Sequence, residues 1–222
     1  MARLRLAVLI SGRGSNLKAL IDACATAGYP AEIVLVLSDR PGAPGLAYAR
    51  DAGLETLVVD YREFPDRTAF DEALHAALVD ARAELVCLAG FMRLLDADFV
   101  SRWRNRLINI HPSLLPAYRG LRTHERVLED GVRFTGCTVH YVRAEMDAGP
   151  VIIQAVVPVR PDDTPETLAA RVLAYEHRIY AEAVRLIATG AARVSGSRVV
   201  IKGAETPREG LISPLPATTD RS

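Results

Sequence analysis

The sequence has no excess of charge of either sign and no long hydrophobic run. Lysine plus arginine and aspartate plus glutamate number 27 each in 222 residues, so no overall positive field exists to hold a nucleic acid or an anionic membrane. No apolar run approaches the roughly 20 residues that span a bilayer, and residues 1–5 lead straight into a strand-like segment, so we expect no cleavable leader. We therefore expect a cytoplasmic protein that acts on small molecules, without nucleic-acid or membrane partners.

Cysteine is also scarce. The three cysteines, Cys24, Cys87 and Cys137, are widely spaced among apolar neighbours and form no Cys-x-x-Cys pair. This pattern predicts buried packing residues in a reducing compartment rather than a redox or metal motif. No cluster of Asp, His or Cys has metal-ligand spacing, so we expect no metal.

Short, nearly all-apolar segments recur in the first half of the chain, as is typical of parallel strands covered on both faces. They span residues 4–10, 33–37, 56–59, 85–89 and 107–110. Helical candidates alternate with them, at residues 17–26, 45–52, 68–82 and 96–102. This alternation predicts an α/β fold with a doubly wound, mostly parallel sheet and helices on both faces.

The pattern changes in the second half. Residues 134–142 and 151–159 predict two added strands that pair antiparallel around a polar turn. Thr164, Pro165 and Glu166 supply a cap, an N1 proline and an acid at the start of a long helix that we expect to end near Thr189. We expect residues 1–203 to form a single domain and residues 204–222, rich in Pro, Thr and charge, to form a flexible tail.

A glycine loop, Ser11-Gly12-Arg13-Gly14-Ser15-Asn16, follows the first strand. Glycines at a helix N-terminus let backbone N–H groups approach an anion, and Ser15 and Asn16 can cap the helix or donate to phosphate oxygens. A tight turn with an ordinary cap is the alternative interpretation. A dinucleotide-binding site is a further alternative, because Asp39 after the second strand matches the acid that such a site requires. The glycine pattern of dinucleotide sites also requires a third glycine, however, and Leu17 stands at that position here. We favour phosphate binding by Gly14, Ser15 and Asn16.

Polar residues gather at the end of the fifth predicted strand. Asn109 and His111 are two residues apart, so both side chains point to the same side of the sheet, and Pro112 then stops the strand. Asn can donate an N–H and protonated His can donate as well, which suits stabilisation of an oxyanion. Asp147 on the later polar turn could orient this histidine and favour its protonated form. A structural histidine is the alternative; His140 is the second-tier candidate.

Four segments of the sequence together resemble the glycinamide ribonucleotide formyltransferase family, folate-dependent enzymes of purine synthesis. They are Leu9 to Leu17 (LISGRGSNL), Leu88 to Arg93 (LAGFMR), Ile108 to Pro116 (INIHPSLLP) and Asp147 to Ile152 (DAGPVI). The resemblance extends from Leu4 to Ala188 and implies a Rossmann-like formyltransferase fold. It implies transfer of a formyl group from 10-formyltetrahydrofolate to the amine of glycinamide ribonucleotide. The oligomeric state stays open, and a homodimer is possible.

The resemblance also implies roles for individual residues. Asn109, His111 and Asp147 would be catalytic, the glycine loop would seat the substrate phosphate, and Glu176 would contact the ribonucleotide. The folate would be bound by Arg67, Met92, Arg93, Leu94, Leu95, Asn109, Arg143, Ala144, Glu145, Met146 and Asp147. Leu173 departs from the glutamine that some relatives carry three residues before the acid, so a polar substrate contact is missing or replaced.

Several alternatives stay open. Relatives that formylate initiator methionyl-tRNA or hydrolyse formyltetrahydrofolate share the His-Pro-Ser-Leu-Leu-Pro type of segment, but we expect them to carry an extra C-terminal or N-terminal domain. A binding module that holds a phosphorylated ligand without turnover would need only the glycine loop. The glycine loop combined with Asn109, His111 and Asp147 favours the transferase.

Overall fold

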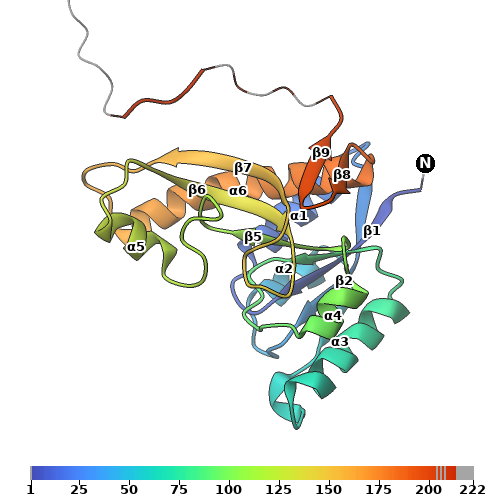
Figure 1. Ribbon diagram of the computed structural model, residues 1–222. Coiled ribbons are helices and arrows are strands. Elements are labelled where there is room, and N and C mark those ends of the chain that lie inside the picture. Colours follow the sequence, from blue (N-terminus) through green and yellow to red (C-terminus); the bar gives the residue numbers. More distant parts are fainter. Residues whose placement is uncertain (1, 204, 206, 208, 214–222) are drawn as a thin grey trace, which may run out of the picture.

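A seven-stranded sheet forms the centre of the computed structural model, which describes residues 2–203, 205, 207 and 209–213. The strands are β1 (Leu4–Ile10), β2 (Ala31–Ser38), β3 (Thr56–Val58), β4 (Leu85–Leu88), β5 (Leu107–His111), β6 (Phe134–Tyr141) and β7 (Val151–Pro158). Their order in the sheet is β3-β2-β1-β4-β5-β6-β7 (Figure 1). β1 to β5 run parallel, whereas β6 is antiparallel to β5 and β7, which confirms the predicted mostly parallel sheet.

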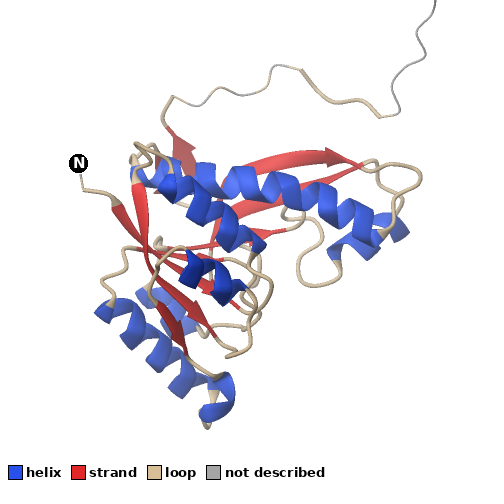
Figure 2. Cartoon of the chain, turned by 180° about the vertical axis from the view of Figure 1, so that it is seen from behind, coloured by secondary structure: helices blue, strands red, loops and turns tan. Residues whose placement is uncertain are grey.

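Helices cover both faces of this sheet (Figures 1 and 2). They are α1 (Ser15–Ala25), α2 (Gly45–Asp51), α3 (Arg67–Asp80), α4 (Ala97–Arg102), α5 (Thr123–Glu129) and α6 (Pro165–Ala188), with a short 3-10 helix, η1 (Tyr61–Glu63). Buried side chains of α1, α2, α5 and α6 pack on one face, and those of α3 and α4 pack on the other. The sheet is thus doubly wound, as predicted.

The apolar sequence of β1 is explained by burial on both sides. Leu6, Val8 and Ile10 belong to the core under α1, α2 and α6, while Ala7 and Leu9 belong to the core under α3 and α4. All five are fully buried. Because side chains alternate across a strand, a strand covered on both faces must be apolar at every position. Each such Leu or Ile stabilises the fold by about 1.5–3 kcal/mol.

The long helix α6 begins where the sequence predicts. Thr164 is its N-cap and Pro165 its first residue; the Thr164 hydroxyl accepts from the N–H of Thr167, whose hydroxyl accepts in return from the N–H of Thr164. Such a cap stabilises a helix by about 1 kcal/mol. α6 packs along β6 and β7 (Figure 2).

Three local features differ from the predictions. α1 begins at Ser15 rather than at residue 17, because the loop turns at Gly14. A two-stranded antiparallel hairpin, β8 (Ala192–Ser195) and β9 (Arg198–Ile201), was not predicted, since strands of four residues are too short to show a clear alternation. Cys24 is only partly buried, whereas Cys87 and Cys137 are buried as expected.

The predicted tail falls partly outside the described residues, which exclude 204, 206, 208 and 214–222. Residues 205, 207 and 209–213 lie in neither a helix nor a strand. Within the part of the chain that the structure describes, no helix is both long enough and apolar enough to cross a membrane.

Candidate active site

The glycine loop is shaped by a close approach of two backbone segments. Gly14 has a left-handed backbone (φ 75°) and is the N-cap of α1, so Ser15 is the first helical residue. A Cβ on Gly14 would lie 2.6 Å from the Cα of Gly45 at the start of α2. No side chain caps α1, so of the two roles considered for Ser15 and Asn16, capping of the helix is not observed. The first N–H groups of α1 are therefore available to an anion.

The side chain of Asn16, which we expected to donate to a phosphate, is turned inward. Its Nδ2 donates a 2.7 Å hydrogen bond to Glu176 Oε2 on α6, and both residues are buried. Burial raises the pKa of Glu176, and the hydrogen bond from Asn16 opposes this shift. The Asn16 Oδ1 atom is buried without a hydrogen-bond partner among the described residues. The structure thus brings together two residues that the resemblance assigned to the ribonucleotide, and the amide nitrogen of Asn16 is engaged by Glu176.

Asn109, in the middle of β5, is oriented by His140, which lies opposite it on β6. His140 Nδ1 lies 3.2 Å from the Tyr141 carbonyl, which can only accept, so Nδ1 carries the proton. The other ring nitrogen, Nε2, then accepts from Asn109 Nδ2 at 3.4 Å. Burial lowers the pKa of His140 to about 4, which keeps the ring neutral and able to accept. Asn109 itself lines the cavity described below.

His111 lies between two acceptors. Its Nδ1 is 3.5 Å from Asp147 Oδ2, and its Nε2 is 2.9 Å from the carbonyl of Tyr118. The Tyr118 carbonyl can only accept, so Nε2 carries a proton, and Nδ1 faces the carboxylate of Asp147. The same Asp147 oxygen accepts from the N–H of Gly120 at 2.9 Å, and Oδ1 lies 3.8 Å from His140 Nε2. The structure therefore brings Asn109, His111, His140 and Asp147 together, as the sequence predicted.

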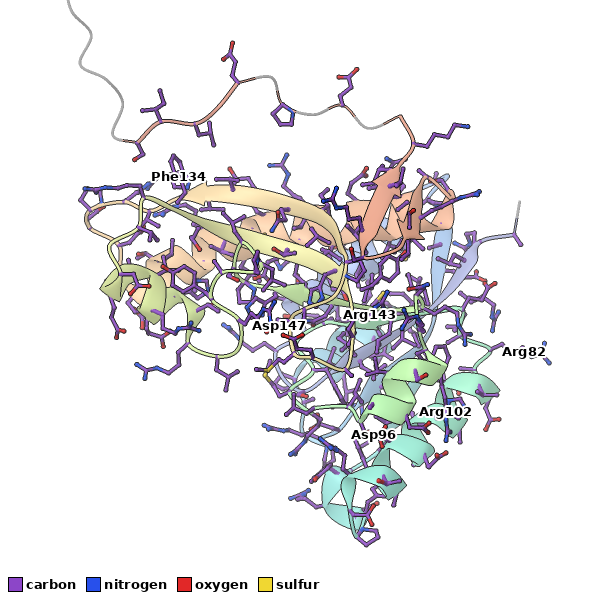
Figure 3. The ribbon with its side chains drawn as sticks, viewed as in Figure 1. Arg82, Asp96, Arg102, Phe134, Arg143 and Asp147 are labelled. Carbon is purple, nitrogen blue, oxygen red and sulfur yellow. The ribbon has the colours of Figure 1, made fainter. Side chains whose placement is uncertain are left out.

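Unusual backbone conformations accompany this group. Tyr118, Arg122 and Asp147 all have positive φ angles of 53° to 55°, which non-glycine residues rarely adopt. Asp147 lies on the loop between β6 and β7, at the opposite end of β6 from Phe134 (Figure 3). Such strain, about 1–3 kcal/mol per residue, persists only where surrounding contacts fix the conformation. Asp147 is fixed by its contacts with His111 and Gly120, and Tyr118 by the contact of its carbonyl with His111.

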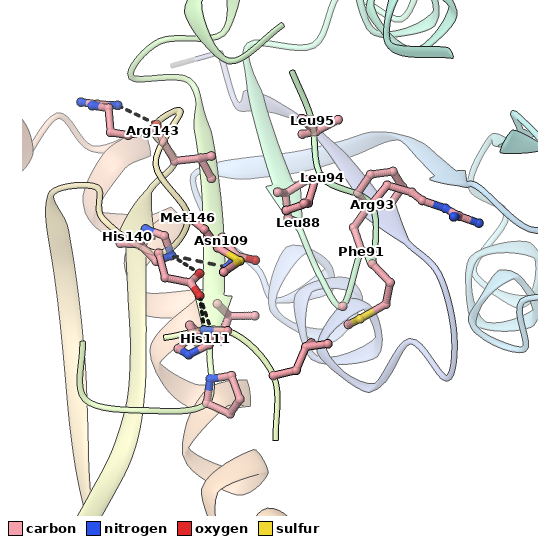
Figure 4. Close-up of a pocket in the computed structure, with 18 of the residues that line it drawn as sticks. Leu88, Phe91, Arg93, Leu94, Leu95, Asn109, His111, His140, Arg143 and Met146 are labelled. Atoms are coloured by element: carbon pink, nitrogen blue, oxygen red, sulfur yellow. Dashed lines mark hydrogen bonds and ion pairs between the residues drawn. The ribbon is translucent and has the colours of Figure 1, made fainter. Parts of the chain in front are cut away.

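A cavity of about 320 Å³ lies beside these polar residues. Figure 4 shows Asn109, His111 and His140 on one side of it and the apolar side chains of Leu88 and Leu94 on the other. Of the predicted folate-binding residues, the cavity is lined by Met92, Arg93, Leu94, Leu95, Asn109, Arg143, Ala144, Met146 and Asp147. Apolar walls with a few polar groups suit a flat heteroaromatic ligand.

Other lining residues were missed by the sequence reasoning. They are Leu88, Gly90, Phe91, Val100, Ile110, Pro112, Gly120, Leu121, Arg122, Thr123 and Val142. Most of them are next to predicted site residues in the sequence, so their proximity to the segments around Gly90 and His111 could have indicated that they line the cavity. Residues 120–123 could not have been found in this way, because this segment reaches the cavity only by folding back from β5.

Three of the residues assigned to folate are placed differently from the rest. Arg67 is exposed at the start of α3 and does not line the cavity. Glu145 is exposed, pairs with Arg119, and is likewise absent from the lining. Arg93 lines the cavity, but its guanidinium points away from it and binds Asp39 (Figure 4). In the described residues, no group of three His, Cys, Asp or Glu side chains is placed to hold a metal ion.

These features together define an α/β enzyme of the group-transfer class. They are the doubly wound sheet, the glycine loop with free N–H groups at the start of α1, and the Asn–His–Asp group beside an apolar cavity. A family model described as formyl transferase matches residues 4–184. The chain therefore belongs to the formyl transferase family.

Individual relatives agree with this assignment. The chain is 42% identical over 207 residues to the phosphoribosylglycinamide formyltransferase of Escherichia coli (strain K12), covering 93% of this chain and 98% of that protein. It is 50% identical over 192 residues (86% of this chain) to the trifunctional purine biosynthetic protein adenosine-3 of Gallus gallus, of which it spans 19%. A crystal structure of glycinamide ribonucleotide transformylase 1 from Symbiobacterium toebii superposes with a TM-score of 0.88 at 50% identity, covering 90% of this chain and 94% of that one.

Proposed function

We propose that this chain transfers the formyl group of 10-formyltetrahydrofolate to the amine of glycinamide ribonucleotide, as a cytoplasmic step of purine synthesis. The observation that carries the proposal is the convergence of Asn109, His111 and Asp147 on the wall of one apolar cavity. The names of the similar proteins support formyl transfer as the reaction and glycinamide ribonucleotide as the acceptor.

The reaction follows from the groups on the cavity wall. The substrate amine attacks the formyl carbon, and negative charge develops on the formyl oxygen. Asn109 offers its second N–H to that oxygen, and protonated His111 supplies positive charge beside it. The bond between the formyl carbon and N10 then breaks. The proton released by the amine passes to N10, directly or through water, with Asp147 keeping His111 protonated.

The spacing of the strands fits the acceptor. β1, which leads to the glycine loop, and β5, which ends at His111, are separated only by β4. Two strand spacings amount to about 10 Å. A ribonucleotide with its phosphate on the N–H groups of Gly14, Ser15 and Asn16 can therefore present its amine near Asn109.

The cavity fits the donor. Its apolar wall suits the pterin ring, and the exposed edges of Met92 and Met146 can move to admit it. The proposal needs 10-formyltetrahydrofolate as co-substrate and no metal.

The test is to mix purified protein with 10-formyltetrahydrofolate and to follow release of tetrahydrofolate with and without glycinamide ribonucleotide. Release that depends on the ribonucleotide, with one formylated product per tetrahydrofolate, is the expected result. Equal release without the ribonucleotide would instead identify a hydrolase. Binding of both ligands without release would identify a binding module.

A further inference from the structure

The segment that joins β4 to α4 forms one wall of the cavity beside His111. Its residues 90–95 line the cavity (Figure 4), and residues 89–96 lie in neither a helix nor a strand. Phe91 and Leu95 pack against the core under α3 and α4, whereas Met92 and Leu94 are 61% and 64% exposed. Packing therefore holds only alternate side chains of this segment. The part that faces a ligand depends on hydrogen bonds of the backbone.

Hydrogen bonds from outside the cavity hold both ends of residues 90–96, called the wall segment below. At its start, the N–H of Ser11 donates to the Gly90 carbonyl at 3.2 Å, and the Ser11 hydroxyl accepts from the N–H of Met92 at 2.8 Å. At its end, Oδ2 of Asp71 accepts from the N–H of Asp96 at 2.7 Å. Ser11 follows β1 and Asp71 lies on α3, so two separate elements hold the wall segment.

The environment of Asp71 is unfavourable for a carboxyl group. The residue is only 3% exposed, and burial raises the pKa of its side chain to about 6. Its Oδ1 atom is buried without a hydrogen-bond partner among the described residues. A well-packed apolar side chain at a buried position costs less free energy than a carboxylate with one unpaired oxygen. Stability of the fold therefore does not explain the carboxyl group of Asp71, whereas its bond to the wall segment gives it a use.

The bond from Asp96 to Asp71 lies at the point where the wall segment becomes a helix. Asp96 is the N-cap of α4, and its Oδ1 accepts from the N–H of Phe99 at 2.7 Å. α3 contacts α4 along this side of the sheet (Figure 1). Asp71 thus fixes the backbone of the residue that ends the wall segment and begins α4. A shift of this end of the wall breaks either the bond to Asp71 or the cap of α4.

We propose that Asp71 is a positioning residue for the folate donor, because it holds the end of the wall segment in place without contacting the ligand. Asp71 itself does not line the cavity. This inference rests on the proposed function, which places the pterin ring against the apolar wall. A ligand binds only those molecules in which the wall is in place, so loss of the bond raises the dissociation constant by the inverse of their fraction. The proposed chemistry depends on Asn109 and His111 on β5, so kcat is unaffected.

Two substitutions at Asp71 separate its hydrogen bond from its presence. We expect Asp71→Ala to raise the dissociation constant for tetrahydrofolate and KM for 10-formyltetrahydrofolate by about three- to tenfold, the effect of one hydrogen bond of ordinary strength. kcat and KM for the ribonucleotide should stay within about twofold. Asp71→Asn should restore the values of the unaltered protein, because its carbonyl oxygen can accept from Asp96 and its amide takes the place of the unpaired oxygen. Calorimetric titration with tetrahydrofolate and steady-state kinetics measure these quantities.

Glu72→Ala is the matched control. Glu72 is the next residue of α3 and pairs with Arg102 of α4, so its loss loosens the same two helices without removing a bond to the wall segment. We expect this variant to bind tetrahydrofolate as the unaltered protein does. An unchanged dissociation constant in Asp71→Ala would overturn the proposal, and so would an equal rise in Asp71→Asn or in Glu72→Ala.

The fold and the second substrate show whether the role of Asp71 is merely structural. Failure of Asp71→Ala to fold, or a parallel rise in its KM for the ribonucleotide, would overturn the proposal, because Asp71 would then support the whole site. Thermal unfolding of each variant is measured for this purpose. An unaltered protein that binds tetrahydrofolate but transfers no formyl group would contradict the proposed function alone, since the dissociation constants of the variants still test Asp71.

Discussion

His140 and Asn109 face each other across neighbouring strands, and the ring nitrogen Nε2 of His140 accepts the amide N–H of Asn109 at 3.4 Å. His140 is thereby a positioning residue: it fixes which way the Asn109 amide points. A donor aimed at a developing oxyanion is effective only if its direction is set before the reaction. The proposed chemistry therefore depends on a histidine that does not itself contact the formyl group.

Replacing His140 tests this positioning role. We expect His140→Leu to lower kcat by about 10- to 100-fold, because the Asn109 amide can then rotate, while KM for the ribonucleotide stays within about twofold. His140→Gln should restore much of kcat, since its carbonyl oxygen can accept the same N–H. Steady-state kinetics of both variants, beside Asn109→Ala with its expected loss of about 100- to 1000-fold, measures the effect. Equal kcat values for His140→Leu and the unaltered protein would show that His140 does not position Asn109.

Stability should depend on pH through the same histidine. The pKa of His140 is about 4 in the folded protein, below the value of 6.5 for an unperturbed histidine, because burial disfavours the charged ring. The unfolded chain therefore binds the proton more tightly, and this contribution to stability is lost as pH falls from about 6.5 to about 4. The loss is up to about 3 kcal/mol. Chemical denaturation at several pH values in this range gives the free energy of unfolding of the protein and of His140→Gln, and the difference between the two measures this loss. The same dependence of the free energy of unfolding on pH in both proteins would contradict the prediction.

Asp147→Asn isolates the charge beside His111. Asparagine tolerates the left-handed backbone that Asp147 adopts, and its carbonyl oxygen can still accept from the N–H of Gly120. Only the negative charge beside Nδ1 of His111 is removed. We expect kcat to fall on the order of 100-fold or more with little change in melting temperature. A large fall in melting temperature would show that the role of Asp147 is structural, and an unchanged kcat would show that its charge is not used.

The sequence could predict the polar residues that a single strand positions. Asn109 and His111 follow from an apolar strand stopped by Pro112, because strand alternation and the carboxyl edge of a parallel sheet are local and general features. Asp147 could be suggested as the partner of His111 from its polar turn, but the contact itself could not be predicted from the sequence. It arrives on a loop 36 residues later, and no periodicity in the chain encodes that contact.

Side chains captured by distant partners could not be predicted. Asn16 was expected to donate to phosphate, but Glu176, 160 residues away, takes its amide. Arg93 was expected on the folate, but the buried carboxylate of Asp39 turns its guanidinium to the far side. In both cases a buried charge requires a hydrogen-bond partner, and the three-dimensional fold decides which one is near.

Ser15→Asp tests the phosphate seat separately from the chemistry. A carboxylate in the first turn of α1 would stand where the substrate phosphate is proposed to bind, and two like charges at close range repel strongly. We expect at least about tenfold weaker ribonucleotide binding, with the dissociation constant for folate unchanged. Ser15→Ala, which removes the hydroxyl without adding charge, should weaken binding less. Calorimetric titration of both variants checks this, and unaltered ribonucleotide affinity in Ser15→Asp would place the phosphate elsewhere.

Gly14→Ala tests the close contact that shapes the same loop. Gly14 has φ +75°, and its added Cβ would lie 2.6 Å from the Cα of Gly45, so the substitution combines backbone strain with a steric clash. Gly28 has φ +81° with nothing within 4 Å of its Cβ position, so Gly28→Ala measures the strain alone, about 1–2 kcal/mol. We expect Gly14→Ala to lower the free energy of unfolding by about 1–3 kcal/mol more than Gly28→Ala does, and to weaken ribonucleotide binding, which Gly28→Ala leaves intact. Equal destabilisation by the two substitutions would mean that the loop can move away from α2, and the phosphate seat would then not be held rigidly by that contact.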